Sequence, residues 1–152
     1  MPNTLHDWAM RHNLPASALQ ELVALLTYTP DLPAGKSEAA VQNEIRLAAA
    51  RRGITLWRNN VGAYETPEGQ WVRYGLNNDS SAANRRMKSA DLIGIHRPSG
   101  RFVSIEVKRP GWKHSDASER DRAQAAWAAT VAAMGGVALR ATSASAITDL
   151  EI

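Results

Sequence analysis

The chain has 152 residues, of which 44% are hydrophobic and 22% charged, so it should fold as one soluble domain, and disordered and collagen-like classes are excluded. It contains no cysteine, which rules out disulfides, thiolate zinc sites and cysteine nucleophiles and leaves oxygen or imidazole ligands for any metal. The net charge of +3 comes from residues 85–122, which carry ten basic and five acidic side chains. Such a local excess suits a polyanionic partner, or it is a solvated basic surface.

Residues 1–36 are predicted to be a helical appendage, separate from the main fold. The spacing of apolar residues predicts short helices at 4–13 and 15–28. The segment 29–36 then contains two prolines and a glycine, which is typical of a linker. The main domain is therefore expected to span residues 37–152.

The first half of the main domain is predicted to form a helix, a strand and a hairpin. Ser37 as N-cap and Gly53 as terminator bound a helix whose apolar residues lie on one stripe. Residues 54–60 follow as a strand and residues 63–76 as a hairpin. The polar and basic segment 77–90 shows no consistent period, so a mobile loop is expected there.

The second half contains two more strands, a long helix, a further strand and a short closing helix. The expected bounds are 91–95 and 102–108 for the two strands, 119–134 for the helix, 137–142 for the last strand and 143–152 for the closing helix, with a loop at 109–118. This order predicts an α/β fold with a central mixed β-sheet flanked by helices, in which the last strand is parallel to a neighbour.

Two acidic residues and a lysine fall on the two consecutive strands. Because side chains alternate along a strand, Glu106 and Lys108 share one face, while the apolar residues between them face the core. If a six-residue connection pairs Ile95 with Phe102, Asp91 falls opposite Glu106. Opposed carboxylates destabilise a sheet unless a cation lies between them, and a divalent ion or Lys108 fits that place. The alternative is an exposed ion pair between Glu106 and Lys108, with Asp91 capping a strand.

Four stretches of the chain occur in an order that points to a nuclease family. They are SEAAVQNEIRLAAARRGITLWRNNVGAY, SADLIGI, FVSIEVKRPG and RAQAAWAATVAAMGGVA, within residues 37–142. Together they resemble the VRR-NUC branch of the PD-(D/E)XK nuclease superfamily, in its phage-type stand-alone form. The resemblance implies a restriction-endonuclease-like core that hydrolyses DNA phosphodiesters with Mg²⁺ or Mn²⁺. One departure is Ala90, where the family often has a proline before the aspartate.

The resemblance also implies roles for single residues. Asp91 and Glu106 match two metal ligands, and the backbone carbonyl of Val107 would be a further ligand. Lys108 matches a lysine that helps to position the attacking water and stabilises the developing charge. A metal and a lysine aimed at a phosphodiester transition state lower its barrier electrostatically, although a lysine beside a metal can also serve as a base.

Two further residues complete the implied catalytic set. Glu38 matches the acid of the first helix, in a second metal site or an outer shell, and its spacing from Gln42, Ile45 and Ala49 places it on the core-facing stripe. Alternatively, Glu38 only complements the helix dipole. Gln124 matches a glutamine of the late helix near the lysine, or it caps a sheet edge by hydrogen bonding.

Basic and aromatic residues near these strands are candidates for contacts with DNA. Phosphate contacts, or ordinary surface charges, are expected for Arg85, Arg86, Lys88, Arg109 and Lys113. Trp57 and Trp127 are expected to fill the core, whereas Trp112, in a loop beside a glycine, is a candidate for stacking on an unpaired base.

The function implied by the resemblance is a metal-dependent, structure-selective DNA endonuclease. Stand-alone members resemble homodimers that resolve Holliday junctions, since two sites related by a twofold axis can cut opposite strands. The alternatives are a nicking or flap nuclease, and a module of a phage replication or packaging assembly that binds DNA junctions without cutting. Because the chain has no membrane-spanning apolar run and no signal-like start, a cytoplasmic protein is expected, in the bacterial host cell if a phage encodes it.

Overall fold

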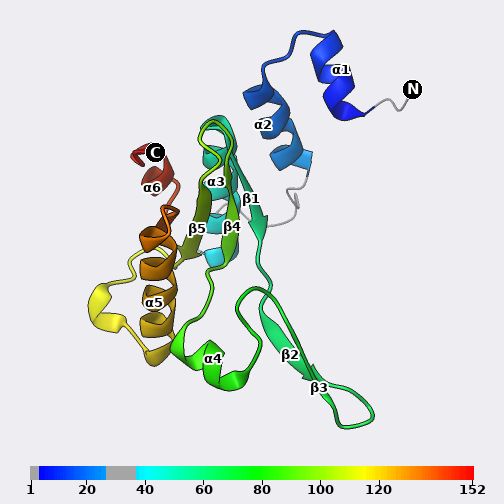
Figure 1. Ribbon diagram of the computed structural model, residues 1–152. Helices are drawn as coiled ribbons and strands as arrows, with labels where there is room; N and C mark the ends of the chain where they lie inside the picture. The colour runs from blue at the N-terminus through cyan, green and yellow to red at the C-terminus, as the bar shows by residue number, and fades with distance from the viewer. Residues whose placement is uncertain (1–3, 27–36) are drawn as a thin grey trace.

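A mixed four-stranded β-sheet lies at the centre of the structure, a computed structural model that describes residues 4–26 and 37–152 (Figure 1). The helices are α1 (Leu5–Arg11), α2 (Ala16–Leu26), α3 (Glu38–Arg51), α4 (Ser81–Arg86), α5 (Glu119–Ala133) and α6 (Ser145–Thr148), with a 3-10 turn at His114–Asp116. The strands are β1 (Ile54–Arg58), β2 (Gly62–Glu65), β3 (Trp71–Tyr74), β4 (Leu92–His96), β5 (Phe102–Val107) and β6 (Val137–Ala141). The α/β class, with a mixed central sheet flanked by helices, is confirmed.

The strand register agrees with the one predicted from the sequence. In the order β1-β4-β5-β6, the first two pairings are antiparallel and the last is parallel, as expected for the closing strand. Ile95 pairs with Phe102, and Leu92 pairs with Ile105 at the other end of the ladder. Asp91 directly precedes Leu92, and Glu106 directly follows Ile105, so continuation of this register places Asp91 opposite Glu106. A side chain at Gly94 would collide with the carbonyl of Thr55 on β1, which explains a glycine inside this strand.

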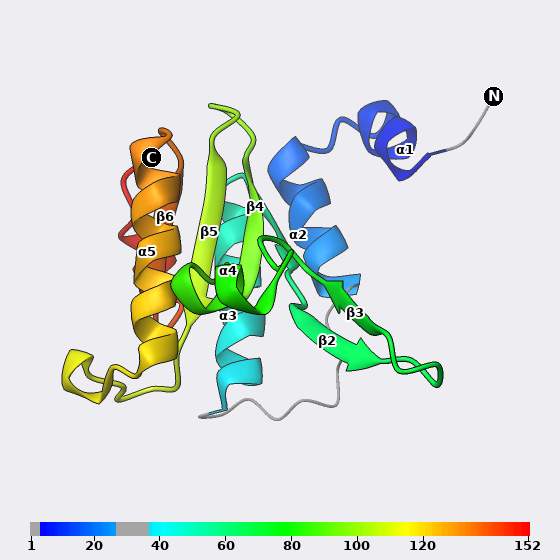
Figure 2. The ribbon, with the colours of Figure 1, turned by 60° about the horizontal axis from the view of Figure 1, so that its bottom comes forward.

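Helices cover both faces of β5. On one face, its apolar side chains join a core with residues of α3 and α6, including the fully buried Ile45 and Ile147. On the other face lies α5 (Figure 2). Trp127 of this helix donates from Nε1 to Ser104 Oγ on β5 at 2.8 Å. The alternating polar residues of β5 are therefore buried beneath α5.

Helix α3 follows the expected capping pattern. The Ser37 hydroxyl accepts from the backbone nitrogen of Ala40 at 3.2 Å, which satisfies one of the free donors at the helix start. The helix stops before Gly53, whose φ of +71° few other residues adopt readily. The Arg52 guanidinium then donates to carbonyls of the α6 segment, including that of Leu150 at 2.7 Å. These contacts join the end of α3 to the closing helix.

Helix α2 lies against the main sheet domain. Gln20 Nε2 donates to Thr55 Oγ1 on β1 at 3.2 Å, and Glu21 pairs with Arg51 of α3 at 2.8 Å. The two predicted N-terminal helices are therefore present, while the predicted linker at 29–36 lies outside the described residues. None of the helices described here has the length and apolarity needed to cross a bilayer.

The structure corrects the expectations for the segment 77–90 and for Trp57. Residues 77–90 are not simply a loop, since they contain the six-residue helix α4. Ser80 is the N-cap of this helix, and its hydroxyl accepts a hydrogen bond from the backbone nitrogen of Ala83 at 3.0 Å. Trp57 does not fill the core, because 50% of it is exposed. It lies on β1, an edge strand of the sheet, and alternates with the inward-facing Leu56.

Candidate active site

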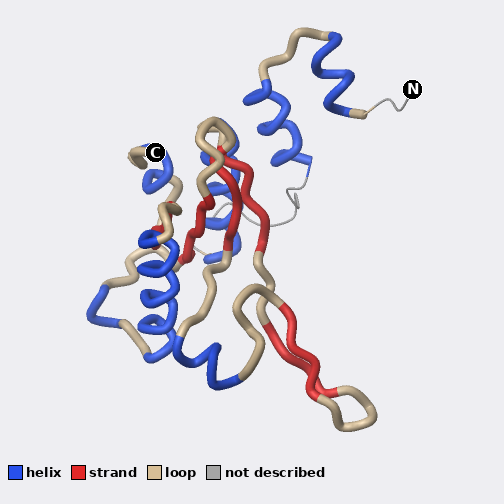
Figure 3. Tube along the Cα trace, viewed as in Figure 1, coloured by secondary structure: helices blue, strands red, loops and turns tan. Residues whose placement is uncertain are grey.

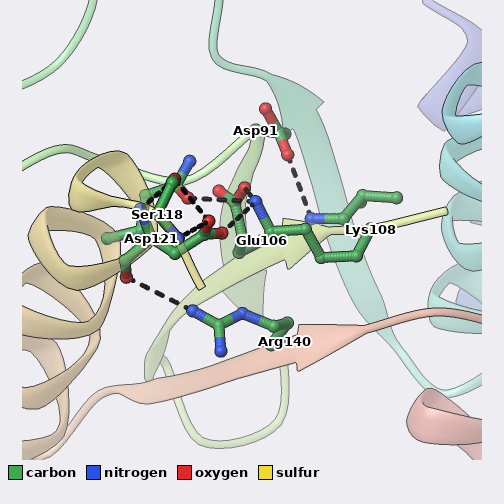
Figure 4. Close-up of polar contacts among 8 residues, drawn as sticks. Asp91, Glu106, Lys108, Ser118, Asp121 and Arg140 are labelled. Carbon is green, nitrogen blue, oxygen red and sulfur yellow. Dashed lines mark hydrogen bonds and ion pairs between the residues drawn. The ribbon is translucent and has the colours of Figure 1, made fainter. Parts of the chain in front are cut away.

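Asp91 is fixed at the end of the sheet by the neighbouring strands. Its Oδ2 accepts a hydrogen bond from the backbone nitrogen of Val107 at 3.0 Å, and its carbonyl accepts from the Asn59 nitrogen at 2.8 Å. Asn59 also donates from its side chain to the Ala90 carbonyl at 2.9 Å. The aspartate is thus held between the segments that follow β1 and end β5, with its carboxylate beside the backbone next to Glu106 (Figure 4).

Glu106 and Lys108 form an ion pair, but a buried one. Lys108 Nζ lies 2.8 Å from Glu106 Oε1, and only 9% of Lys108 and 6% of Glu106 are exposed. The alternative of an exposed surface pair is therefore wrong, because α5 covers this face of β5. Burial makes the pairing electrostatically stronger and makes any unpaired charge expensive.

Asp121 is a member of the site that the sequence did not reveal. Lys108 Nζ lies 2.7 Å from Asp121 Oδ1 and donates to Gln124 Oε1 at 3.1 Å, so three acceptors surround the ammonium group. Asp121 is itself held by a capping box, in which its Oδ2 accepts from the nitrogen of Ser118 at 2.8 Å. The sequence signal was this Ser-x-x-Asp pattern, followed three residues later by Gln124 on the same helix face.

The electrostatics of Glu106 favour a second positive charge beside it, in addition to Lys108. Burial, and secondly the charge of Asp91, raise the pKa of Glu106 to about 7 despite the nearby Lys108. Its second oxygen, Oε2, is buried without a hydrogen-bond partner. Since native structures rarely leave a buried carboxylate oxygen unsatisfied, this atom marks a place for a ligand that donates or carries positive charge.

Lys108 is held in its charged form. Burial acts to lower the pKa of its ammonium group, but the hydrogen bonds and charges of Asp121 and Glu106 outweigh burial and raise the pKa. The pKa of Asp121 is held below its usual range, because its hydrogen bonds to Lys108 and Ser118 outweigh the opposing effect of burial. In this arrangement Lys108 is a fixed cation, which suits stabilisation of an anion better than proton abstraction.

The carboxylates of Asp91 and Glu106 could hold a hard divalent cation. Asp91 has a second oxygen beyond the one that Val107 binds, and Glu106 offers the unpaired Oε2. Within residues 4–26 and 37–152, no group of three or more His, Cys, Asp or Glu side chains is assembled for a metal. A cation here would therefore rely on two carboxylates, on the expected carbonyl of Val107 and on water, a donor set that suits Mg²⁺.

Glu38 does not lie on the buried stripe of α3. It is exposed in the first turn, whereas burial on this helix begins with Ala40 and Val41. The prediction that its side chain faces the core is therefore wrong, because the helix starts beyond the edge of the core. Figure 2 shows this end of α3 at the same end of the sheet as the end of β5.

The predicted DNA-binding residues lie on two segments around the site. Arg85 and Arg86 are exposed on α4, and Lys88 follows them, half-buried, with its backbone nitrogen donating to the Ala123 carbonyl of α5 at 3.1 Å. Arg109 and Lys113 are exposed on the segment that leaves β5. Of these five basic residues, Lys88 is the one on which the charges of Glu106 and Asp91 are shown to act.

Trp127 and Trp112, the other two tryptophans considered in the sequence analysis, differ in environment. Trp127 is partly buried on α5 and packs edge-on against Phe102, at 6.4 Å between ring centroids. The Arg140 guanidinium lies 4.4 Å from the ring centroid of Trp112 and covers one face of that ring. A base could therefore stack on Trp112 only from its other face.

Comparisons of the chain with family models, curated proteins and solved structures found no match. The chemistry of the site must therefore be inferred from its own geometry. The buried Glu106 contacts Lys108, which is held charged, and the partly buried Asp91 accepts a hydrogen bond from the backbone next to Glu106. This combination can bind a divalent ion and stabilise negative charge on a phosphoryl group.

Proposed function

We propose that the protein is a divalent-metal-dependent endonuclease that hydrolyses DNA phosphodiesters. The observation that carries the proposal is the unpaired, buried Oε2 of Glu106, a carboxylate that feels the charge of Asp91 and pairs through its other oxygen with Lys108. A bound Mg²⁺ or Mn²⁺ would supply Lewis-acid stabilisation of the charge that develops on the phosphate oxygens. Asp91 and Glu106 hold the ion, and the carbonyl of Val107 is proposed as a further ligand.

Lys108 is the proposed anion stabiliser of the reaction. Its three acceptors take up its three N–H donors, fix its position and keep it charged, so it stabilises the developing negative charge through its own positive charge. A direct hydrogen bond to a nonbridging phosphate oxygen would replace one of these three contacts. Gln124 orients Lys108 from the adjacent helix. Glu38 remains a proposed outer participant, since the start of α3 lies at the same end of the sheet.

The arrangement of the sheet supports assignment to the VRR-NUC branch with its restriction-endonuclease-like core. The acidic pair comes from the residue before β4 and from the antiparallel strand β5, and the supporting residues come from the helix that precedes the parallel strand β6. We propose branched DNA, in particular the four-way junction, as substrate and a phage-type homodimer as the acting form. Such an enzyme would work in the cytoplasm of a bacterial host.

The test is cleavage of labelled duplex, flap and four-way-junction DNA in Mg²⁺, Mn²⁺ or EDTA. We expect cutting with either metal, none in EDTA, and a loss of about 100-fold or more in kcat for Lys108→Ala. Cutting that persists both in EDTA and in Lys108→Ala would overturn the mechanism. Junction binding without cutting under every metal condition would instead support the non-cleaving module.

A further inference from the structure

A cavity of about 260 Å³ lies between α4 and the start of α5. Its lining residues are Asn84, Arg85, Lys88, Glu119, Arg120 and Ala123. Three of these side chains are cationic and one is acidic, so the cavity carries a net positive charge. Its volume is sufficient for a phosphate group and part of a sugar.

The cavity offers hydrogen-bond donors in excess of acceptors. Lys88 Nζ donates to Asn84 Oδ1 at 3.2 Å, which uses the oxygen of this amide, while Asn84 Nδ2 is buried and has no partner. Burial, and secondly the charge of Arg120, lower the pKa of Lys88, so these two cations lie close enough to repel each other. Two neighbouring cations and an unpaired amide donor are the chemistry that recognises an anion.

The cavity adjoins the acidic pair of the candidate active site. The charges of Glu106 and Asp91 act on Lys88, and the charge of Arg120 acts on Glu106. Ala123, which lines the cavity, is the direct neighbour of Gln124, the residue that holds Lys108. An anion in the cavity would therefore lie beside a phosphodiester placed at Asp91 and Glu106.

We propose that this cavity binds one backbone phosphate of the DNA strand, adjacent to the phosphate that is cleaved, with Arg120, Lys88 and Asn84 as its contacts. The identity of the ligand as DNA rests on the proposed function, while the affinity of the cavity for a phosphate group follows from its own side chains. Arg120 is a positioning residue in this scheme. It fixes where the strand lies and does not touch the reacting atoms.

The chain offers a matched pair of variants for the test. Arg120→Ala removes a cavity cation, and Arg122→Ala removes another exposed cation two residues further along α5, outside the cavity. Binding of a fluorescent four-way junction is measured by anisotropy in EDTA, between about 50 and 200 mM salt. For Arg120→Ala we expect Kd to rise about tenfold and the salt slope to fall by about 0.9, and for Arg122→Ala we expect little change in either.

Two further measurements separate positioning from general charge. In cleavage assays, Arg120→Ala should raise KM and leave the kcat of bound DNA nearly unchanged. Asn84→Asp replaces the unpaired donor with an acceptor of the same size, and it should weaken junction binding at least as much as Arg120→Ala. Thermal unfolding midpoints verify that each variant remains folded.

The outcomes distinguish this inference from the proposed function. Equal changes in Arg120→Ala and Arg122→Ala, or none in either, would overturn the phosphate site even if the wild-type protein cuts DNA. Wild-type protein that binds junctions without cutting would overturn the nuclease proposal, while the salt slopes would still decide the phosphate site. Wild-type protein that fails to bind DNA would overturn both.

Discussion

The residue that most distinguishes this site is Asp121. It belongs to the capping box of α5 and also contacts the ammonium group of Lys108. One carboxylate therefore accepts a hydrogen bond at the start of a helix and also pairs with a buried cation. A helix start is therefore coupled to the charge of the site. Removing the carboxylate charge should leave Lys108 with Glu106 as its only acidic partner.

We expect Asp121→Asn to destabilise the fold by about 1–3 kcal/mol, because it leaves a buried ammonium group partly uncompensated. Urea unfolding measures this loss. Ser118→Ala is the control: it removes the hydroxyl of the same capping box at a cost of about 1 kcal/mol but keeps the charge. If Asp121→Asn is no less stable than Ser118→Ala, the ion pair with Lys108 contributes nothing to stability.

The raised pKa of Glu106 predicts a pH dependence of stability in the metal-free protein. A carboxyl group whose folded-state pKa is about 7, against 4.5 for the unperturbed group, stabilises the fold while protonated, and this contribution disappears as the pH rises from about 4.5 to 7. Relative to Glu106→Gln, the wild-type protein should therefore lose up to about 3 kcal/mol across that window.

The measurement is the free energy of unfolding of both proteins in EDTA across this pH range. Since Mn²⁺ favours the ionised carboxylate, its addition should reverse the loss in the wild-type protein and leave Glu106→Gln unaffected. Parallel pH curves for the two proteins would show that Glu106 titrates normally and that its burial imposes no electrostatic cost.

At the scale of elements, local signals and pairing geometry predicted most of the fold. Helix α3 could be predicted because Ser37 and Gly53 bound a single apolar stripe. The register of β4 and β5 could be predicted because a short connection permits symmetric pairing. The level of Asp91 relative to Glu106 follows from that pairing alone.

The elements and contacts that sequence reasoning missed depend on packing between distant parts of the chain. Helix α4 has only six residues, which is too short for a helical period of apolar residues to be recognised in the sequence. The residue that follows its C-cap, Lys88, donates a backbone hydrogen bond to the carbonyl of Ala123 on α5, a contact between distant parts of the chain. Trp57 lies on the edge strand β1, and it would be buried only if another part of the chain covered its face of that strand. The local sequence pattern does not indicate whether such a cover is present. Asp121 reaches Lys108 only because the segment between β5 and α5 folds back, so the Ser-x-x-Asp pattern indicates the start of α5 but not this contact.

At the scale of the whole molecule, the β2–β3 hairpin projects as an arm from the sheet (Figure 1, Figure 3), and it carries exposed aromatic side chains. Tyr64 pairs across the strands with Val72 and lies 6.5 Å from the ring of Tyr74, and all three residues are exposed on one face. An isolated two-stranded sheet is only marginally stable in water, so this arm would gain from a partner surface. The acidic residues Glu65 and Glu68 near its tip disfavour DNA as that partner.

We therefore expect the arms of two copies to pack against each other through this aromatic face, which gives the twofold homodimer that paired cuts in a junction require. Tyr64→Ser combined with Val72→Ser should convert the dimer to a monomer that nicks a junction without resolving it. Trp71→Ser is the control, because Trp71 is 65% exposed on the opposite face of the same hairpin and should leave the dimer intact. Sedimentation equilibrium measures the masses: a monomeric wild-type protein at micromolar concentration, or a dimer that survives the double substitution, would show that the arm does not join two copies.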